Sequence, residues 1–270
     1  MKKALLPFAI AVVLVYSLLP FLWFVLASWK SPAQLTAIPP EIVPAFHWGF
    51  YRSALTTYGL PGYIRNSVIV ATATTVVSVA IGTLAAYALT RFHFAWLRFY
   101  LVVLLCVSMF PQIAVAGPVW RILDALGWLN SYQGIVVAYI SFSLPLAIWI
   151  LATFFKELPY EIEEAALIDG CSRPQALRRV VLPLAAPGIF TAAILVFIYA
   201  WNEFFFALIV LTSPALQTLP VGIALFPGEY TMPWGELAAA STIATLPLIA
   251  LTLFFQRRII GGLSAGAVKG

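Results

Sequence analysis

The sequence predicts an all-α polytopic membrane protein with six transmembrane helices. Of its 270 residues, 63% are hydrophobic and only 9% are charged, and the mean hydropathy is +0.99. A soluble globular domain carries about 25% charged residues. A helix needs about 20 apolar residues to cross the hydrocarbon core of a bilayer. Six stretches qualify, and we expect spans at about 5–29, 67–90, 99–118, 133–155, 188–211 and 236–256.

The basic residues orient these spans. With the N-terminus inside the cell, eleven Lys and Arg residues fall in segments on that side and four on the other. Because cytoplasmic loops are the ones enriched in Lys and Arg, we expect both termini in the cytoplasm. The chain is then one transmembrane domain, residues 1–270, with both termini on the cytoplasmic side of the membrane. The net charge of +5 comes from residues at the ends of apolar runs, so we expect lipid, and no nucleic acid, as a partner.

The first two spans are separated by a proline-rich segment. The apolar run after the N-terminal lysines is about twice as long as that of a signal peptide, so we interpret it as a retained span. Residues 31–65 contain five prolines, which exclude one long helix. We assign the aromatic residues of this segment to the membrane interface rather than to ligand stacking. Asn66 or Ser67 is expected to cap the second span.

The third and fourth spans each contain a proline. The sequence Met-Phe-Pro-Gln interrupts the third span at 109–112, and Pro145 interrupts the fourth. Neighbouring helices can satisfy the carbonyl groups that such breaks leave free. Two interpretations stay open: bends that line a cavity, or purely structural kinks.

The fifth span contains the one acidic residue that lies deep in an apolar run, Glu203. A charged carboxyl group in mid-membrane costs about 3 kcal/mol on insertion scales. Tyr199, Asn202 and Glu203 share one helical face and are candidate cavity-lining residues. The alternative for Glu203 is a structural role, protonated or paired.

Residues 156–187 form the one strongly polar interior stretch and hold nine of the 25 charges. Acidic residues after Pro159 and a glycine at 170 predict a short helix from about Pro159 to Asp169. Ser172 and Gln175 fit a capping box for a second short helix, which Pro183 is expected to end. The segment is either a loop on the membrane surface or a helix pair that a partner protein receives.

The spacing of this segment resembles the EAA signature of membrane subunits of bacterial ATP-binding cassette (ABC) importers. The matching residues are Glu164, Ala165, Ala166, Gly170, Leu182 and Pro183, with Val180 where the signature usually has isoleucine. The resemblance implies the type I ABC importer fold, with a cytoplasmic coupling helix between spans four and five. It also implies contact with a cytoplasmic ATPase through Glu164, Ala165, Ala166, Asp169, Gly170 and Arg173.

Residues 185–204 and 256–270 resemble the carbohydrate branch of that family, the second permease subunits of maltose- and trehalose-type systems. This likeness implies four partner chains: a related permease, two copies of an ATP-binding cassette ATPase and an extracytoplasmic sugar-binding protein. The substrate implied is a disaccharide or oligosaccharide such as trehalose or maltose. The cytoplasmic tail, 257–270, would contact the ATPase through Ser264, Gly266 and Lys269, although terminal residues are commonly disordered.

The sequence lacks the motifs of an enzyme. It has no GxxxxGK[ST] loop, so we expect ATP and Mg²⁺ to be bound by the partner ATPase and no cofactor by this chain. His47 and His93 are isolated, and we expect no metal site and no catalytic residue. The rival function is a passive facilitator or membrane scaffold without ATPase coupling, in which 156–187 would be only a loop.

Overall fold

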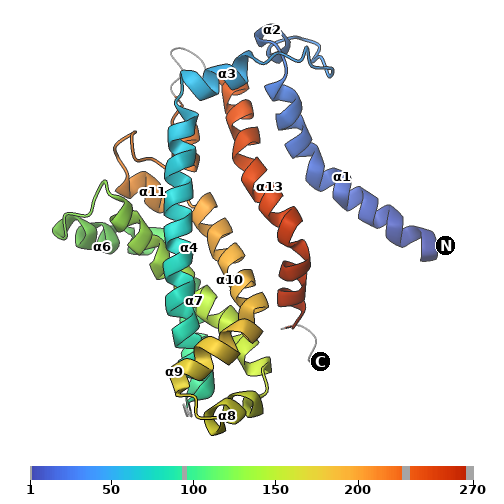
Figure 1. Ribbon diagram of the computed structural model, residues 1–270. Helices are drawn as coiled ribbons and strands as arrows, with labels where there is room; N and C mark the ends of the chain where they lie inside the picture. The colour runs from blue at the N-terminus through green and yellow to red at the C-terminus, as the bar shows by residue number, and fades with distance from the viewer. Residues whose placement is uncertain (1, 93–95, 227–231, 266–270) are drawn as a thin grey trace.

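The computed structural model describes residues 2–92, 96–226 and 232–265, and every regular element in these ranges is a helix (Figure 1). In chain order they are α1 (Lys2–Ser28), α2 (Pro32–Leu35), α3 (Gly49–Thr56), α4 (Leu60–Arg91), α5 (Leu97–Ser108), α6 (Gln112–Ala125), α7 (Tyr132–Glu157), α8 (Tyr160–Ile168), α9 (Arg173–Ala176), the π-helical turn η1 (Leu177–Val181), α10 (Leu182–Asn202), α11 (Phe205–Val210), α12 (Leu219–Ala224) and α13 (Trp234–Ala265). The prediction of an all-α fold is confirmed.

Five stretches in the described ranges are long and apolar enough to cross a membrane. They lie in α1, in α4, in α7, in the continuous helical run from Arg173 to Asn202, and in α13. The predicted third span, 99–118, is divided between α5 and α6, which have 12 and 14 residues. At 1.5 Å per residue each is about 20 Å long, less than the roughly 30 Å of a hydrocarbon core. The six-span count is therefore not confirmed.

The division falls at Met109–Pro111, where the sequence places its third-span break. Pro111 precedes the first turn of α6 with φ −60° and ψ 122°, an extended conformation that a helix cannot continue. Proline also lacks the N–H that would bond to the preceding turn. The break is thus a complete helix end rather than a kink.

Helices α4, α7 and α10 form the centre of the bundle (Figure 1). Small residues set their spacing: a Cβ added to Gly82 of α4 would lie 3.3 Å from the Cβ of Ala147 in α7. The hydroxyl oxygens of Ser78 and Ser143, on the same two helices, are 2.9 Å apart. Close approach through small residues and interhelical hydrogen bonds is how helices associate in lipid, where apolar side chains gain little by meeting each other.

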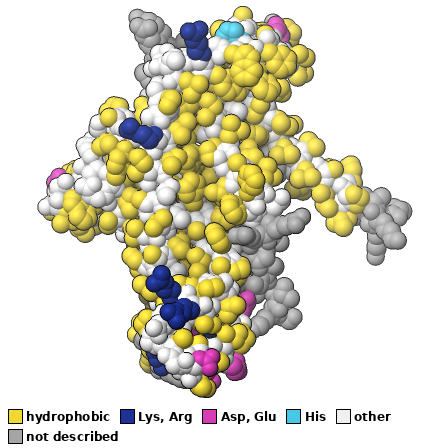
Figure 2. Space-filling model, in the orientation of Figure 1, with side chains coloured by type: hydrophobic (Ala, Val, Ile, Leu, Met, Phe, Trp, Pro, Cys, Tyr) yellow, Lys and Arg dark blue, Asp and Glu magenta, His cyan; other side chains and the backbone are white. Residues whose placement is uncertain are grey.

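Helices α1 and α13 lie to one side of this centre. The C-terminal end of α1 packs mainly against α13, and the N-terminal end of α1 diverges from the bundle (Figure 1). Figure 2 shows an apolar surface across the middle of one face, with most of the visible acidic and basic side chains at the end that carries α8 and α9. We call this end the polar end, and the end that carries α2 and α3 the far end.

The prediction that Asn66 or Ser67 caps the second span is wrong, because α4 begins earlier, at Leu60. Both residues are buried inside α4 and bind the segment before α12 instead. The Asn66 amide donates to the carbonyl oxygens of Ala215 (3.0 Å) and Gln217 (2.9 Å), and the Ser67 hydroxyl accepts from the Leu219 N–H (2.7 Å). Their polarity holds a loop rather than starting a helix.

Candidate functional site

The polar end is built around α8, which follows the predicted bounds closely. Pro159 precedes the helix, Glu161 and Glu163 lie in its first turn, and the N–H of Asp169 bonds to the carbonyl of Ala165 at its end. Gly170 follows with φ +89°, the left-handed conformation that glycine adopts without a steric penalty. A β-carbon there would meet no atom within 4 Å, so backbone conformation alone selects glycine. The predicted helix and its stop are confirmed.

The second predicted short helix is part of a longer one. The capping box of Ser172 and Gln175 is present, with the Ser172 N–H donating to Oε1 of Gln175 at 2.8 Å. Pro183, however, does not end the helix, because α9 continues through the π turn η1 into α10. The carbonyl that a proline ring would strike is that of Arg179, which lies within this wider turn. The run from Arg173 to Asn202 is one 30-residue helix.

The outer face of α8 and its exit carry most of the predicted coupling residues. Glu164, Ala165, Asp169, Gly170 and Arg173 are exposed. The guanidinium carbon of Arg173 lies 5.1 Å from the centre of the Phe92 ring, a cation–π contact with the residue after α4. These residues therefore form an exposed face of mixed charge at the polar end.

Ala166 faces the opposite way. It is 8% exposed, whereas Ala165 is exposed, so the two alanines of the signature lie on different faces of α8. Ala166 packs toward the rest of the chain and is not available to a partner protein. Of the two alanines, Ala165 is the one on the exposed face of α8.

Sequence reasoning missed Glu163, the buried acid of α8. Its side chain is 2% exposed, with Oε2 3.2 Å from Nε of Arg91, the last residue of α4. These two atoms are within ion-pair distance, but no hydrogen bond joins them. The Tyr87 hydroxyl donates to Oε1 of Glu163 at 2.5 Å, and Arg91 also donates to the Leu158 carbonyl at 3.1 Å. The acid that faces inward is thus paired with Arg91 and hydrogen-bonded to Tyr87, and both of these residues belong to α4.

The fifth predicted span, 188–211, is broken at Glu203: α10 ends at Asn202 and α11 begins at Phe205. Glu203 is 7% exposed, and its two carboxyl oxygens accept hydrogen bonds from the N–H groups of Phe206 (2.9 Å) and Ala207 (3.2 Å). These are N–H groups of the first turn of α11, which have no partner within the helix. Glu203 therefore caps α11.

The other two candidate cavity residues separate from Glu203. Asn202 is exposed and lines a cavity of about 300 Å³ with residues of α12 and α13, such as Pro220 and Ser241. Its amide donates to the carbonyl of Ile198 at 2.8 Å. Tyr199 is half-buried, and its hydroxyl accepts from the Gln112 amide at 3.0 Å. Of the three candidates, Asn202 is the one that lines this cavity.

The predicted tail contact lies at the limit of the described residues. The last predicted span ended at 256, but α13 continues to Ala265 and includes Ser264 in its last turn. Gly266 and Lys269 lie outside the described residues. In the part of the chain that the structure describes, no group of three or more His, Cys, Asp or Glu side chains is placed to hold a metal ion.

Sequence comparison finds one matching family. The family described as "binding-protein-dependent transport system inner membrane component" matches residues 78–264, more than half of the chain. This range contains the second part of α4, all of α5 to α12 and α13 up to Ser264, and with them the polar end. The match therefore includes both α8 and the break at Glu203.

Three curated relatives cover nearly the full chain. The trehalose/maltose transport system permease protein MalG of Thermococcus litoralis is 40% identical, over 100% of this chain and 98% of the relative. The sulfoquinovosyl glycerol transport system permease protein SmoH of Agrobacterium fabrum is 40% identical, over 97% and 92%. The trehalose transport system permease protein SugB of Mycobacterium tuberculosis is 41% identical, over 94% and 93%.

A solved structure shares the fold. A chain from the crystal structure of a bacterial ABC transporter involved in the import of the acidic polysaccharide alginate superposes with a TM-score of 0.80. The alignment covers 95% of each chain at 20% sequence identity. At that identity the likeness concerns the arrangement of helices and not the substrate.

Proposed function

The chain belongs to the family of inner membrane components of binding-protein-dependent transport systems, and from that premise we propose that it couples sugar import to a cytoplasmic ATPase. In this proposal a second, related permease completes the translocation path, two ATPase copies bind ATP and Mg²⁺, and a sugar-binding protein delivers substrate from outside. Both termini and the polar end face the cytoplasm of a bacterial cell. This chain itself binds no cofactor.

The observation that carries the proposal is the two-sided character of α8. Its outer face presents Glu164 and Ala165, while its inner face is held to α4 by the buried Arg91–Glu163 pair. A partner that moves α8 must therefore move the end of α4 with it. An ordinary surface loop has no reason to bury a charged pair, because removing two charges from water is costly.

A second mechanical connection leads into the membrane. The continuous helix from Arg173 to Asn202 begins at the polar end and ends beside the cavity that Asn202 lines. Thirty residues at 1.5 Å each make a rod of about 45 Å. Displacement at Arg173 is thus carried to Asn202, and two positions of this rod would correspond to the two access states of an importer.

The proposed substrate is a disaccharide or short oligosaccharide such as trehalose or maltose. Two of the three relatives above are named for trehalose transport, and one of these also for maltose. Asn202 and Ser241 supply polar groups to the cavity, which suits hydroxyl-rich ligands. The proposed tail contact through Ser264, Gly266 and Lys269 would add a second ATPase contact at the end of α13.

The test is transport by the assembled importer in proteoliposomes, with its binding protein and trehalose or maltose. We expect uptake that requires ATP inside the vesicles. Glu164→Gln should lower binding-protein-stimulated ATP hydrolysis about tenfold, because a hydrogen bond to a charged group is worth about 1.5 kcal/mol or more. Glu161→Gln, an exposed acid on the same helix, is the matched control. Uptake that persists without ATP would establish the rival, a passive facilitator.

A further inference from the structure

The break in the fifth span replaces backbone hydrogen bonds with side-chain ones. In a continuous α-helix the N–H of Phe206 would bond to the carbonyl of Asn202, and the N–H of Ala207 to the carbonyl of Glu203. In the structure these two N–H groups bond instead to Oε1 and Oε2 of the Glu203 carboxyl group. Glu203 therefore takes both of the donors that would join α10 to α11.

Tyr139 of α7 takes one of the acceptors. Its hydroxyl donates to the carbonyl oxygen of Glu203 at 3.3 Å, and its side chain is fully buried. Glu203 is extended, with φ −67° and ψ 127°, so it does not continue α10. A buried carbonyl group without a partner is costly. The bond from Tyr139 therefore supplies a partner that the break would otherwise leave missing.

Two other helices hold the last turn of α10. The Tyr199 hydroxyl accepts from the Gln112 amide of α6, and the Trp201 indole donates to the Ala244 carbonyl of α13 at 3.2 Å. These bonds precede the break in the chain and do not depend on it. The place of Asn202 at the end of α10 is thus fixed, and the break decides what lies over its side chain.

In a continuous helix, Phe205 and Phe206 would lie over Asn202. Residues three and four positions later share a helical face, and their side chains lean back toward the preceding turn. In the structure α11 packs against α7 instead, where Phe206 is fully buried and its ring centre is 5.1 Å from that of Phe142. Asn202 is left exposed. The break therefore uncovers the Asn202 amide.

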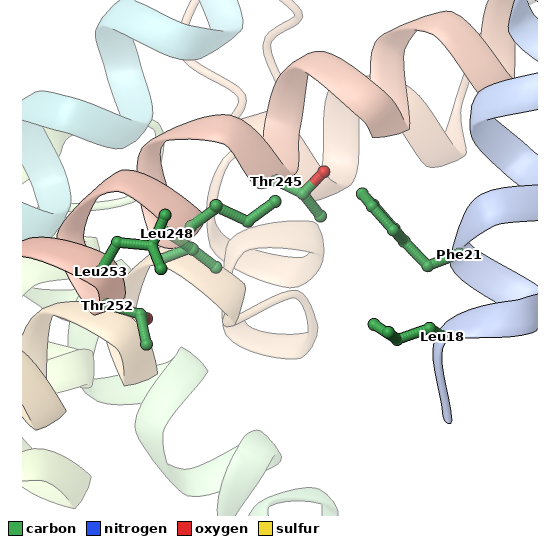
Figure 3. Close-up of a pocket in the computed structure, with 7 residues that line it drawn as sticks. Leu18, Phe21, Thr245, Leu248, Thr252 and Leu253 are labelled. Carbon is green, nitrogen blue, oxygen red and sulfur yellow. The ribbon is translucent and has the colours of Figure 1, made fainter. Parts of the chain in front are cut away.

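The uncovered amide lines the cavity of about 300 Å³, one wall of which is α13. That wall includes Ser241, Thr245 and Leu248. Figure 3 shows the last two of these side chains, which also line a neighbouring cavity on the side of α1. Covering Asn202 would leave a cavity bounded mainly by apolar side chains, which do not pair with the hydroxyl groups of a sugar.

We propose that Tyr139 and Glu203 are positioning residues, which keep the fifth span broken and so keep Asn202 uncovered for the transported sugar. The sugar rests on the proposed function, whereas the form of the helix does not. Removing the Tyr139 hydroxyl or the Glu203 carboxyl group leaves buried backbone groups unpaired in the broken helix, and a continuous helix would pair them again. Both removals therefore favour the continuous form.

The test is the labelling rate of Asn202→Cys in the assembled importer, in a chain whose two native cysteines are replaced by serine. A small water-soluble thiol reagent reports how accessible position 202 is. We expect Tyr139→Phe alone to lower the rate at least about threefold, and Tyr139→Phe/Glu203→Leu at least about tenfold, the effects of losing one and several hydrogen bonds. Mass spectrometry of the labelled chain measures the rates, and co-purification with the second permease checks assembly.

Tyr132→Phe is the matched control. It removes a hydroxyl from the same helix, but that hydroxyl bonds to Asn66 and not to the break. We expect its labelling rate at 202 to be unchanged. An equal fall in Tyr132→Phe would show a general loosening of α7 and would overturn the proposal.

A proline at 204 separates positioning from a merely structural loss. Phe204→Pro, added to the double variant, should restore the labelling rate because proline disfavours a continuous helix at this point. The extended conformation at 203 suits the residue before a proline. Unchanged labelling in Tyr139→Phe, or no recovery with the proline, would contradict the assigned role. None of these readouts depends on sugar transport, so a failure here leaves the proposed function standing.

Discussion

The Nε atom of Arg91 lies 3.2 Å from Oε2 of Glu163, and this contact joins the last turn of α4 to the first turn of α8. Both side chains are buried, and the Tyr87 hydroxyl completes the partners of the carboxyl group. Breaking such a pair leaves an uncompensated charge in a place that water does not reach. The relationship therefore sets how firmly the proposed coupling helix is attached to the membrane bundle.

We predict that Glu163→Gln destabilises the assembled complex by about 3 kcal/mol, because it leaves Arg91 buried without a countercharge. Glu164→Gln, on the exposed neighbour, should change stability by no more than about 0.5 kcal/mol. Thermal unfolding of the two variants measures the difference. The double variant Arg91→Leu/Glu163→Leu should recover part of the loss, since it removes both charges. Equal stability of the two single variants would contradict the anchoring role.

Gly170→Val should reduce sugar-stimulated ATP hydrolysis by the assembled complex. The site has space for a side chain, but φ +89° is costly for a β-branched residue, by about 1–2 kcal/mol. Gly170→Asn is the control, because asparagine tolerates the left-handed region better. If the valine variant hydrolysed ATP at the full stimulated rate, the exit geometry of α8 would not matter for coupling.

Asn66→Ala should loosen the loop before α12. The substitution removes the donor to two carbonyl oxygens and the acceptor of the Tyr132 hydroxyl, at a cost of about 1–3 kcal/mol. Hydrogen exchange should become faster at the amides of 213–219. Thr75→Ala is the control on the same helix, since its hydroxyl bonds only to the carbonyl of Ala71 one turn earlier. Unchanged exchange in Asn66→Ala would mean that the loop is held by packing alone.

Cysteine substitution distinguishes Asn202 from Glu203. In a chain with Cys106→Ser and Cys171→Ser, we expect Asn202→Cys to react with a small water-soluble thiol reagent in at least one trapped state of the complex. Glu203→Cys should react at least about tenfold more slowly, because position 203 is buried under α11. Mass spectrometry of the labelled chain measures both rates. Inertness at 202 in every state would remove its cavity-lining role.

Deletion of 263–270 tests the tail. Insertion and assembly should be intact, because every candidate span in the described residues ends at or before Gln256. Transport should fall, since the proposed ATPase contact through Ser264, Gly266 and Lys269 is lost. Assembly is checked by co-purification with the second permease. Full transport by the shortened chain would make the tail no more than a chain end.

Features that depend on neighbouring residues follow from the amino-acid sequence alone. Apolar length located α1, α4, α7, α10 and α13, because a bilayer requires about 20 apolar residues whatever the rest of the chain does. The bounds of α8, the left-handed Gly170 and the capping box at Ser172 were likewise predicted, since proline, glycine and cap residues act within one turn.

Tertiary structure decided which polar side chains face inward. Glu163 and Glu164 are adjacent acids on a short helix, and only the position of Arg91 at the end of α4 determines that Glu163 is the buried one. Asn66 looked like a cap and holds a distant loop, and Glu203, for which the sequence left a cavity-lining and a structural role open, caps α11. A buried polar group must find its hydrogen-bond partners in the folded chain, and those partners lie far away in sequence or on the other side of a helix break.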